Sequence, residues 1–386
     1  MPSQSAGGIV IPPEYVDREQ SYLKHLVLDE YLDAWSHKLG SAARYGRTKL
    51  WYVDTFAGPW EERHPQLQDT SFAIALTALR VAAQTWKTRG FDVDVSAIFV
   101  EKNHASFCKL RDYVTTQCGV VSTRALHGEF GDHAAEIQRL LGNDAAFIFV
   151  DPTGWKGAAM SYIAPLVSAR GPRDVLINVM YDHMNRQKDR EAEHVRQQMR
   201  DFFGLHDRDL PPDLGEEDLF DLYRSQLKKR CNVTHAADLS ILHPQAERTK
   251  FRLVIGGKNP KVLQVFRDVE SRVIGHIAGA VRDDARHRND SMQPDLFNPA
   301  PAVDYSYSRQ HAADAQKAKE DILEALHAHG ATTFESIWPA ILEKRHLTLS
   351  DLRRLVAELA SAKRICVANR KSNERAVRDE HLLALP

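Results

Sequence analysis

Short apolar runs alternate along the chain with longer stretches in which apolar residues recur about every three or four positions. Short runs bounded by polar residues are typical of buried strands, and the wider spacing is typical of amphipathic helices. We expect strands at residues 50–53, 93–100, 121–126, 146–150 and 175–180, and helices at 21–35, 72–86, 104–117, 133–141 and 160–167. This alternation predicts a parallel sheet covered by helices.

The pattern changes after the fifth expected strand. Residues 186–230 are highly charged and contain a Leu-Pro-Pro-Asp sequence, which indicates an inserted helical excursion. Two β-rich runs follow at 238–242 and 250–255, separated by turn-forming residues, and they predict an antiparallel pair that completes a mixed seven-stranded sheet. The fold class is therefore α/β and Rossmann-like.

The domain organisation follows from composition. Residues 1–20 are expected to be a flexible arm, 21–288 a Rossmann-like domain, and 289–308, rich in Pro, Asp, Asn and Ser, a linker. Residues 309–386 contain helical patterns at 312–329, 334–344 and 349–361 and strand patterns at 364–368 and 381–385. Three helices with a hairpin predict a winged-helix domain.

Overall composition narrows the class of protein only slightly. The 386 residues carry a net charge of -1, and their 43% hydrophobic and 27% charged content is ordinary for a globular protein. No basic leader and no apolar stretch of membrane length is present, so we expect a cytoplasmic protein without a membrane partner. Cys108, Cys118, Cys231 and Cys366 are widely spaced, and the Asp283, Asp284 and His287 group lacks further ligands, so no metal is expected.

Three expected strands end on carboxylates, namely Asp54, Glu101 and Asp151. Because the carboxyl ends of parallel strands meet at one edge of a sheet, these acids should face one crevice. The alternative for each acid, taken singly, is a helix N-cap. The turn after Asp54 contains Ala57 and Gly58, small residues that allow a ligand to approach the backbone.

The ligand class follows from what these turns contain. The first turn has one glycine and a proline rather than G-x-G-x-x-G, and the chain has no P-loop sequence, so no phosphate cradle is indicated. An acid in the first loop suits a cation or an amine, and an acid after the second strand suits ribose hydroxyls. S-adenosylmethionine, which carries an amine, a sulfonium and a ribose, is the expected cofactor.

Candidate cofactor-binding residues follow from this hypothesis. Asp54 is expected to contact the methionine amine or an ordering water, and Glu101 the ribose. Similarity to related methyltransferases, in which an acid after the third strand contacts the adenine amino group, implies that role for Glu129. Asn103 and Asp132 are interpreted instead as helix N-caps, and Phe130 as either an adenine contact or a core residue. The full set of candidate cofactor residues is Asp54, Phe56, Ala57, Gly58, Glu101, Lys102, Gly128, Glu129 and Phe130.

The acceptor is expected beside the loop after the fourth strand. The candidate catalytic residues are Asp151, Pro152, Thr153 and Trp155. Asp151 would orient an amino nucleophile, and Trp155 would stack on a flipped base or anchor the loop in the core. Further acceptor-side candidates are Lys24, which is otherwise part of a solvated helix face, and Asn178, Asp182, Asn185 and Arg186.

The C-terminal region is locally basic. Between Lys344 and Arg378 the chain has ten Lys or Arg and three Asp or Glu, a balance of 10 − 3 = +7. A basic winged helix is typical of phosphate contact, so nucleic acid, RNA or DNA, is an expected partner; the alternative is a protein-docking module. The candidate nucleic-acid residues are Arg353, Arg354, Lys363, Arg364, Arg370 and Lys371.

The sequences YVDTFAGP, FVEKN, FVDPTGW and VLINVMYDHMNR, together with the C-terminal helices, resemble the bacterial three-Cys-motif partner protein family. The resemblance implies a class I S-adenosylmethionine methyltransferase-like fold and a partner protein with three cysteines and radical-type chemistry. YLKHLVL and the fourth-strand motif are more faintly similar to ribosomal RNA adenine-N6 methyltransferases. DPTG stands where amino-methyltransferases have DPPY, and Trp60-Glu61-Glu62-Arg63 follows the first turn.

Two functions remain after this comparison of motifs. The first is an S-adenosylmethionine-dependent methyltransferase that acts on a nucleic-acid base amino group. The second is a catalytically weak or inactive subunit that keeps the fold and delivers nucleic acid or protein to a three-cysteine partner. The DPTG sequence and the Trp60 loop are the features that separate them.

Overall fold

The computed structural model describes residues 10–59, 62–117, 119–185, 192–205, 210–211, 214–292, 306–369, 374 and 376–386. The chain divides into two compact units, Met1–Val262 and Leu263–Pro386. This division falls before the expected linker, so residues 263–288, which the sequence assigned to the first domain, cluster with the C-terminal helices. Most of the expected linker, Cys118 and Trp60 lie outside the described residues.

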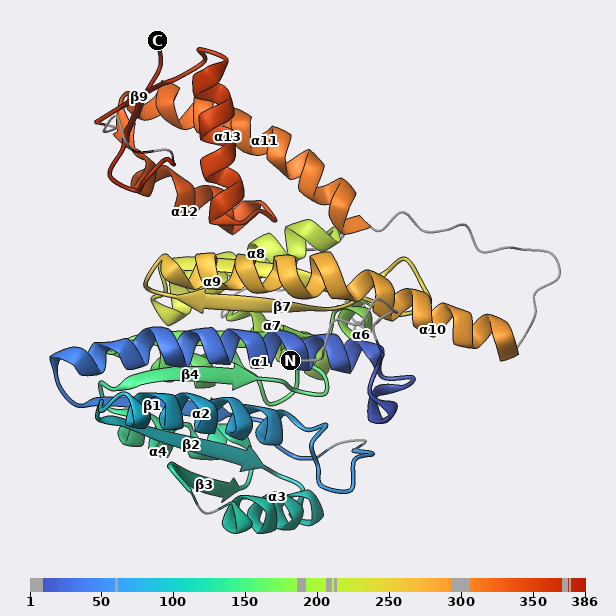
Figure 1. The fold of residues 1–386 in the computed structure, drawn as a ribbon. Coiled ribbons are helices and arrows are strands. Elements are labelled where there is room, and N and C mark those ends of the chain that lie inside the picture. Colours follow the sequence, from blue (N-terminus) through green and yellow to red (C-terminus); the bar gives the residue numbers. More distant parts are fainter. Residues whose placement is uncertain are drawn as a thin grey trace. The chain divides into compact units, whose positions relative to one another are not determined.

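The first unit contains a seven-stranded sheet in the order β3-β2-β1-β4-β5-β7-β6 (Figure 1). Its strands are β1 (Thr48–Asp54), β2 (Val93–Glu101), β3 (Val121–His127), β4 (Ala145–Val150), β5 (Arg173–Val179), β6 (His235–Leu242) and β7 (Thr249–Gly257). β7 pairs antiparallel with both β5 and β6, and the remaining pairs are parallel. The mixed sheet predicted from the sequence is confirmed.

The register brings the expected acids to one edge. β1 lies between β2 and β4, and Asp54 is opposite both Phe99 and Phe149. Glu101 and Asp151 each follow those phenylalanines by two positions. The chain also changes direction across the sheet between β1 and β4, which is the point where open α/β sheets bind their ligands.

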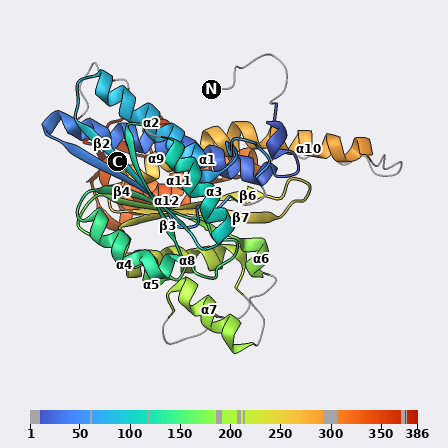
Figure 2. The ribbon, with the colours of Figure 1, turned by 90° about the horizontal axis from the view of Figure 1, so that it is seen from below.

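Helices cover both faces of the sheet because strand residues alternate between the faces. Figure 2 shows α1 and α2 on one face and α4, α5 and α8 on the other. Tyr52 and Phe147 face α1, whose Tyr31 stacks on Phe147 at 5.2 Å between ring centroids. The helices are α1 (Glu19–Gly40), α2 (Ser71–Thr88), α3 (His104–Thr116), α4 (Phe130–Leu141), α5 (Met160–Val167), α6 (Tyr181–Asn185), α7 (Glu193–Phe203) and α8 (Glu216–Cys231).

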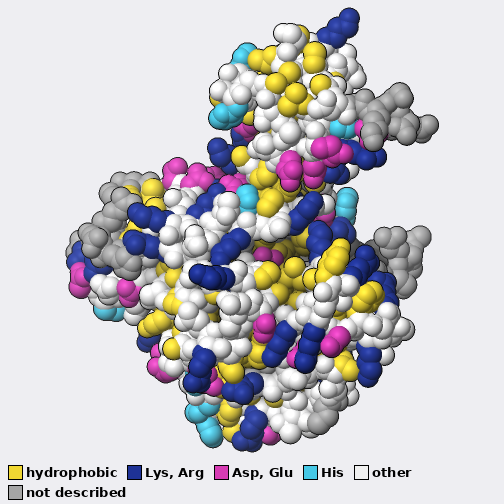
Figure 3. All heavy atoms as spheres, turned by 90° about the vertical axis from the view of Figure 1, so that its left-hand side faces the viewer, with side chains coloured by type: hydrophobic (Ala, Val, Ile, Leu, Met, Phe, Trp, Pro, Cys, Tyr) yellow, Lys and Arg dark blue, Asp and Glu magenta, His cyan; other side chains and the backbone are white. Residues whose placement is uncertain are grey.

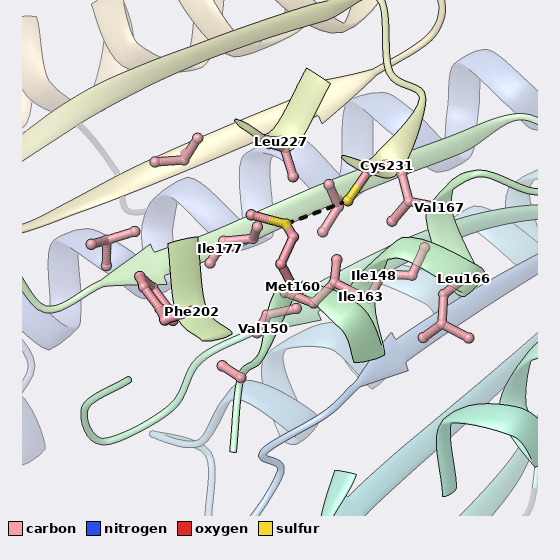
Figure 4. Packing of buried hydrophobic residues seen from close by; sticks show 14 of the residues in the cluster. Ile148, Val150, Met160, Ile163, Leu166, Val167, Ile177, Phe202, Leu227 and Cys231 are labelled. Atoms are coloured by element: carbon pink, nitrogen blue, oxygen red, sulfur yellow. Dashed lines mark hydrogen bonds between the residues drawn. The ribbon is translucent and has the colours of Figure 1, made fainter. Parts of the chain in front are cut away.

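The opposite face forms a continuous apolar cluster. Val53, Ile148 and Ile177 of the central strands pack there with side chains of α5, α7 and α8. Figure 4 shows Ile148 and Ile177 within this cluster. The Cys231 thiol lies 3.5 Å from the sulfur of Met160, and burial raises the pKa of this thiol to about 12. Cys231 is therefore a packing residue.

The charged excursion expected at residues 186–230 is only partly an insertion. α7 has no counterpart in the strand and helix alternation, but α8 packs against β6 and β7 as an ordinary flanking helix. α8 begins with three acidic residues and ends with three basic ones, which complements the helix dipole. The high charge of this segment therefore led to the interpretation of α8 as part of an insertion, although it packs on the sheet.

The last residues of the expected arm, from Pro13 onward, have defined structure. A short 3-10 helix (Pro13–Tyr15) precedes α1, and Tyr15 Oη bonds to His25 Nδ1 at 2.8 Å. Arg18 is buried and donates to Asp69 at 2.9 Å. Long-range partners that follow much later in the chain hold this segment, so its local composition gave no sign of order.

The second unit combines helices with a small sheet. It contains α9 (Lys261–Glu270), a π-helical turn (Ser271–Ile277), α10 (Ala278–Met292), α11 (Ser306–His329), α12 (Phe334–Lys344) and α13 (Leu349–Ser361). Its strands are β8 (Thr332–Thr333), β9 (Cys366–Ala368) and β10 (Leu382–Ala384), in the order β8-β10-β9. The three helices and the hairpin expected from residue 312 onward are present, and a third short strand joins them.

Candidate functional site

A cavity of about 580 Å³ opens at the carboxyl ends of the central strands in the first unit. This volume lies within the range of small-molecule sites, about 300–1,000 Å³. Its lining residues are Arg18, Gln20, Ser21, Lys24, His25, Thr55, Phe56, Gly58, Pro59, Asp69, Thr70, Ser71, Val100, Glu101, Lys102, Asn103, Ser106, Gly128, Glu129, Phe130, Asp151, Pro152, Thr153, Lys156, Gly157, Asn178, Met180, Lys250 and Phe251. The crevice expected from the strand ends is therefore present.

Glu101 and Gly58 are in direct contact across two strand ends. A methyl group at Gly58 would lie 1.9 Å from Glu101 Oε2, so a larger residue there would force this carboxylate to move. Glu101 Oε1 accepts from the backbone N–H of Asn103 at 2.5 Å. Asn103 Oδ1 in turn accepts from Ser106 N at 3.0 Å, which confirms Asn103 as the N-cap of α3. Asn103 nevertheless also lines the cavity.

Asp54 lies beneath the cavity rather than in its wall. It is 0% exposed, and its oxygens accept from Ser71 Oγ at 2.7 Å and from Phe56 N at 3.1 Å. Burial raises the pKa of Asp54 to about 7, against the lowering effect of these hydrogen bonds. The structure gives no support for direct contact between Asp54 and a ligand. Ser71 lines the cavity, so its hydroxyl links the buried Asp54 to the cavity wall.

Other candidate cofactor residues divide between the wall and the core. Phe56, Lys102, Gly128, Glu129 and Phe130 line the cavity, whereas Ala57 is buried and its N–H bonds to Val100 O at 2.8 Å. α4 begins at Phe130, with Glu129 in the N-cap position. The expectation that Asp132 is the N-cap is therefore wrong, because the helix starts earlier than its apolar pattern indicated.

The Asp151 carboxylate is held from two sides. Lys24 Nζ lies 2.5 Å from Asp151 Oδ2, and Asn178 Nδ2 donates to Asp151 Oδ1 at 2.6 Å. The side chains of Lys24 and Asp151 are 13% and 14% exposed, so water screens their ion pair only partly. Lys24 also lies 5.7 Å from the centre of the Phe251 ring. Lys24 thus faces the cavity and not the solvent.

Trp155 is a buried loop anchor, which favours the second of the two interpretations above. It is 8% exposed, its ring packs on His183 at 4.8 Å, and its Nε1 donates to Gln198 at 3.3 Å. It is not among the residues that line the cavity, whereas Pro152 and Thr153 are. The indole is therefore largely covered by protein.

The acceptor-side candidates at the end of β5 and beyond it are mostly outside the cavity. Asn178 lines it, but Asp182 pairs with Arg248 and with Lys250, the latter at 3.6 Å. Asn185 is exposed and away from the lining, and Arg186 lies outside the described residues. Of the expected acceptor-side group, Lys24 and Asn178 are the members that the structure brings to Asp151.

The sequence interpretation missed several lining residues from α1, the loop before α2, and β7. Asp69 has a side chain that is 0% exposed, pairs with Arg18 and accepts from Arg63 N at 2.8 Å. The sequence Asp69-Thr70-Ser71 before an apolar helical pattern is a helix-start signal, and Thr70 is the N-cap of α2. That signal could have located the loop, but nothing in the sequence indicated Phe251.

His25 also lines the cavity, and its ring is neutral. Burial lowers the pKa of His25 well below its usual value, and nearby Lys24 and Arg18 lower it further. A neutral ring nitrogen can accept the hydrogen bond from the Tyr15 hydroxyl. This bond joins the segment before α1 to the wall of the cavity.

The candidate nucleic-acid residues of the second unit differ in their surroundings. Arg353 pairs with Asp379 at 3.0 Å, and Arg354 pairs with Asp351 and Glu358. Lys363 and Arg364 are exposed, and no hydrogen bond or ion pair of their side chains is seen within the described residues. Arg370 and Lys371 fall outside them. On the face shown in Figure 3, Lys and Arg side chains lie scattered among neutral and hydrophobic ones.

In the part of the chain that the structure describes, no helix is both long and apolar enough to span a membrane. The described residues also contain no group of three or more His, Cys, Asp or Glu arranged to hold a metal ion.

The strand order and the antiparallel β7 define a Rossmann-like class I methyltransferase fold. No family model and no curated protein matches the sequence. Among solved structures, protein LPL1258 from Legionella pneumophila is similar with a TM-score of 0.36 and 11% identity, over 65% of this chain and 91% of that one.

Two further solved structures are similar to parts of the chain. M. jannaschii TYW2 in complex with AdoMet has a TM-score of 0.28 and 9% identity, over 56% of this chain and 72% of that one. A putative caffeoyl-CoA O-methyltransferase from Staphylococcus aureus has a TM-score of 0.29 and 11% identity, over 65% and 86%.

Proposed function

We propose that this protein is an S-adenosylmethionine-dependent methyltransferase that methylates an amino group of a nucleic-acid base. The observation that carries the proposal is the joining of Gly58, Glu101 and Asp151 in one cavity at the carboxyl ends of β1, β2 and β4. These strands meet at the switch point of the sheet, where a nucleoside and a second reactant can lie side by side.

The residues present fit the cofactor. Glu101 turns Oε2 toward Gly58, and because the residue lines the cavity its carboxylate can accept from vicinal hydroxyls there. Glu129 lies beyond the end of β3, where it can accept from an amino group on a base. Ser71 donates to the buried Asp54, so its oxygen lone pairs remain for an ammonium group.

When bound, the cofactor supplies a methyl group already activated by a sulfonium. The protein's main task is then to orient the nucleophile and to exclude water. Lys24 and Asn178 fix the plane of the Asp151 carboxylate, each oxygen of which retains a second lone pair. Asp151 is thereby placed to accept a hydrogen bond from an amino group in the cavity and to orient it.

The second unit supports a polyanionic acceptor. Its stretch from Lys344 to Arg378 carries a net charge of +7, and Lys363 and Arg364 are exposed. Clustered Lys and Arg side chains bind phosphates by releasing counterions, which makes such binding dependent on salt.

Calorimetry with S-adenosylmethionine and S-adenosylhomocysteine tests the cofactor assignment. The wild type and Glu136→Ala, which removes a half-buried acid of α4 that does not line the cavity, should bind both. Glu101→Ala should bind at least about ten-fold more weakly, about 1.4 kcal/mol. Absence of heat with the wild type would refute the proposal. Transfer of labelled methyl groups to RNA or DNA tests the acceptor, and transfer to protein alone would contradict that part.

A further inference from the structure

Asn178 has a buried oxygen that the protein leaves without a donor. The residue lies near the carboxyl end of β5, is 2% exposed and lines the cavity. Its Nδ2 donates to Asp151 Oδ1 at 2.6 Å, whereas no donor lies within hydrogen-bonding distance of Oδ1 among the described residues. Buried polar atoms in folded proteins nearly always have a partner, so this oxygen calls for one.

The orientation of the amide is fixed by its neighbours. Asp151 also accepts from Lys24 at 2.5 Å, so its carboxylate is an acceptor on both sides. An amide oxygen turned toward Asp151 would place two acceptors together, and therefore only the NH₂ group of Asn178 can face the carboxylate. The carbonyl oxygen of Asn178 is consequently the atom left over for a ligand.

We infer that Asn178 Oδ1 accepts an N–H hydrogen of the substrate's primary amino group, and that this bond selects the acceptor. The inference rests on the proposed function and adds a specificity-determining residue to it. Asn178 and Asp151 are bonded to each other and line the same cavity, so an NH₂ group can donate one hydrogen to each. A base that lacks the amino group would leave Asn178 Oδ1 buried and without a donor.

Selection of this kind is strong when the site is built around a hydrogen bond. A site that binds a substrate N–H rejects the analogue that lacks it, because the buried acceptor is then left unsatisfied. Ordered water is the alternative partner for Asn178 Oδ1, since buried waters usually satisfy such atoms. If a water remains bound to Asn178 Oδ1, the site should bind bases with and without the amino group equally well. The experiment below detects that outcome.

The test uses the full chain saturated with S-adenosylhomocysteine and two matched pairs of probes. Adenosine 5′-monophosphate is compared with purine riboside 5′-monophosphate, and cytidine 5′-monophosphate with zebularine 5′-monophosphate; each pair differs by the amino group alone. Dissociation constants are measured by calorimetry or ligand-observed NMR for the wild type, Asn178→Ala, Asn178→Ser and Asn143→Ala. Asn143 is an exposed residue just before the amino end of β4, and it serves as the matched control.

In at least one pair, the amino-bearing probe should bind the wild type and Asn143→Ala about ten-fold more tightly than its partner, as expected for an acceptor left unsatisfied. Asn178→Ala should reduce that ratio to about two-fold or less while retaining S-adenosylhomocysteine binding. If Asn178→Ala does not fold, the same measurement is made with Asn178→Ser. Equal binding within both pairs, or a ratio that survives the substitutions, overturns the inference alone. Failure of the wild type to bind S-adenosylhomocysteine overturns the proposed function, and the inference with it.

Discussion

Lys24 Nζ lies 2.5 Å from Asp151 Oδ2, and this ion pair joins α1 to the end of β4 across 127 positions of sequence. The pair gives the acceptor side of the cavity a fixed carboxylate. It also makes α1 part of the site and not merely a cover for the sheet. The consequences for stability and for ligand binding can be measured separately.

Lys24→Met should lower the free energy of unfolding at neutral pH by about 1 to 3 kcal/mol, because it leaves a largely buried carboxylate with fewer donors. Methionine keeps the apolar stem beside Phe251, so packing changes little. The double variant Lys24→Met with Asp151→Asn should recover part of the loss. Urea unfolding of the four proteins checks the coupling, and strictly additive effects would contradict an interaction between the two residues.

Gly58→Ala should weaken binding of S-adenosylhomocysteine about ten-fold or more, equivalent to about 1.4 kcal/mol. The new methyl group would overlap Glu101 Oε2, so the carboxylate has to move away from its place in the cavity. Gly119→Ala is the control, since only Gln117 O at 3.8 Å lies near its added methyl group. Calorimetry gives the comparison, and equal affinities of the two variants would argue against the assigned role of Glu101.

Asp54 should make the protein less stable as the pH rises from about 4 to about 7. Its pKa is raised from 3.8 to about 7 by burial, so the folded state holds its proton through a range in which the unfolded state releases it. The stability present below pH 4 is lost by pH 7, by up to roughly 4 kcal/mol. Unfolding free energies of the wild type and Asp54→Asn are measured across this range. As the pH rises, the variant should become increasingly more stable than the wild type. Parallel curves would show that Asp54 titrates normally.

Arg18→Met should loosen the segment that precedes α1. The side chain of Asp69 is 0% exposed and would lose its ion-pair partner, while keeping the backbone donors of Arg63 and His64. We expect a loss of about 3 kcal/mol in unfolding free energy. Hydrogen exchange should increase first in residues 13–20, and unchanged protection there would indicate that the Tyr15 and His25 contact alone holds the segment.

Lys363→Ala with Arg364→Ala should reduce affinity for duplex RNA or DNA more than Arg353→Ala with Arg354→Ala. The first two side chains are exposed, whereas Arg353 and Arg354 already bind carboxylates within their own unit. The salt dependence of binding should become shallower by about two counterions. Binding that is independent of salt would exclude the nucleic-acid partner.

The sequence was sufficient for the central strands β1, β2 and β4 because each has an apolar run that ends at a carboxylate. It also located Asp151, Glu101 and Gly58, since the ends of parallel strands must meet. It was insufficient wherever a partner is distant: the order of Arg18 depends on Asp69, and the role of α8 depends on β6 and β7. Trp155 illustrates a further limit, because an indole in a loop has the same sequence signature whether it is exposed or packed on His183.

The wall formed by α1 has a consequence for biosynthesis. Lys24 leaves the ribosome well before Asp151, and Phe251 of β7 follows later still. The contacts of Lys24 with these two residues therefore cannot form until most of the first unit has been synthesised. Such non-local closure slows folding, since chain entropy must be lost before these contacts compensate. Ligand affinity should therefore appear late in translation, and ribosome-bound fragments that end before β7 should not retain the cofactor.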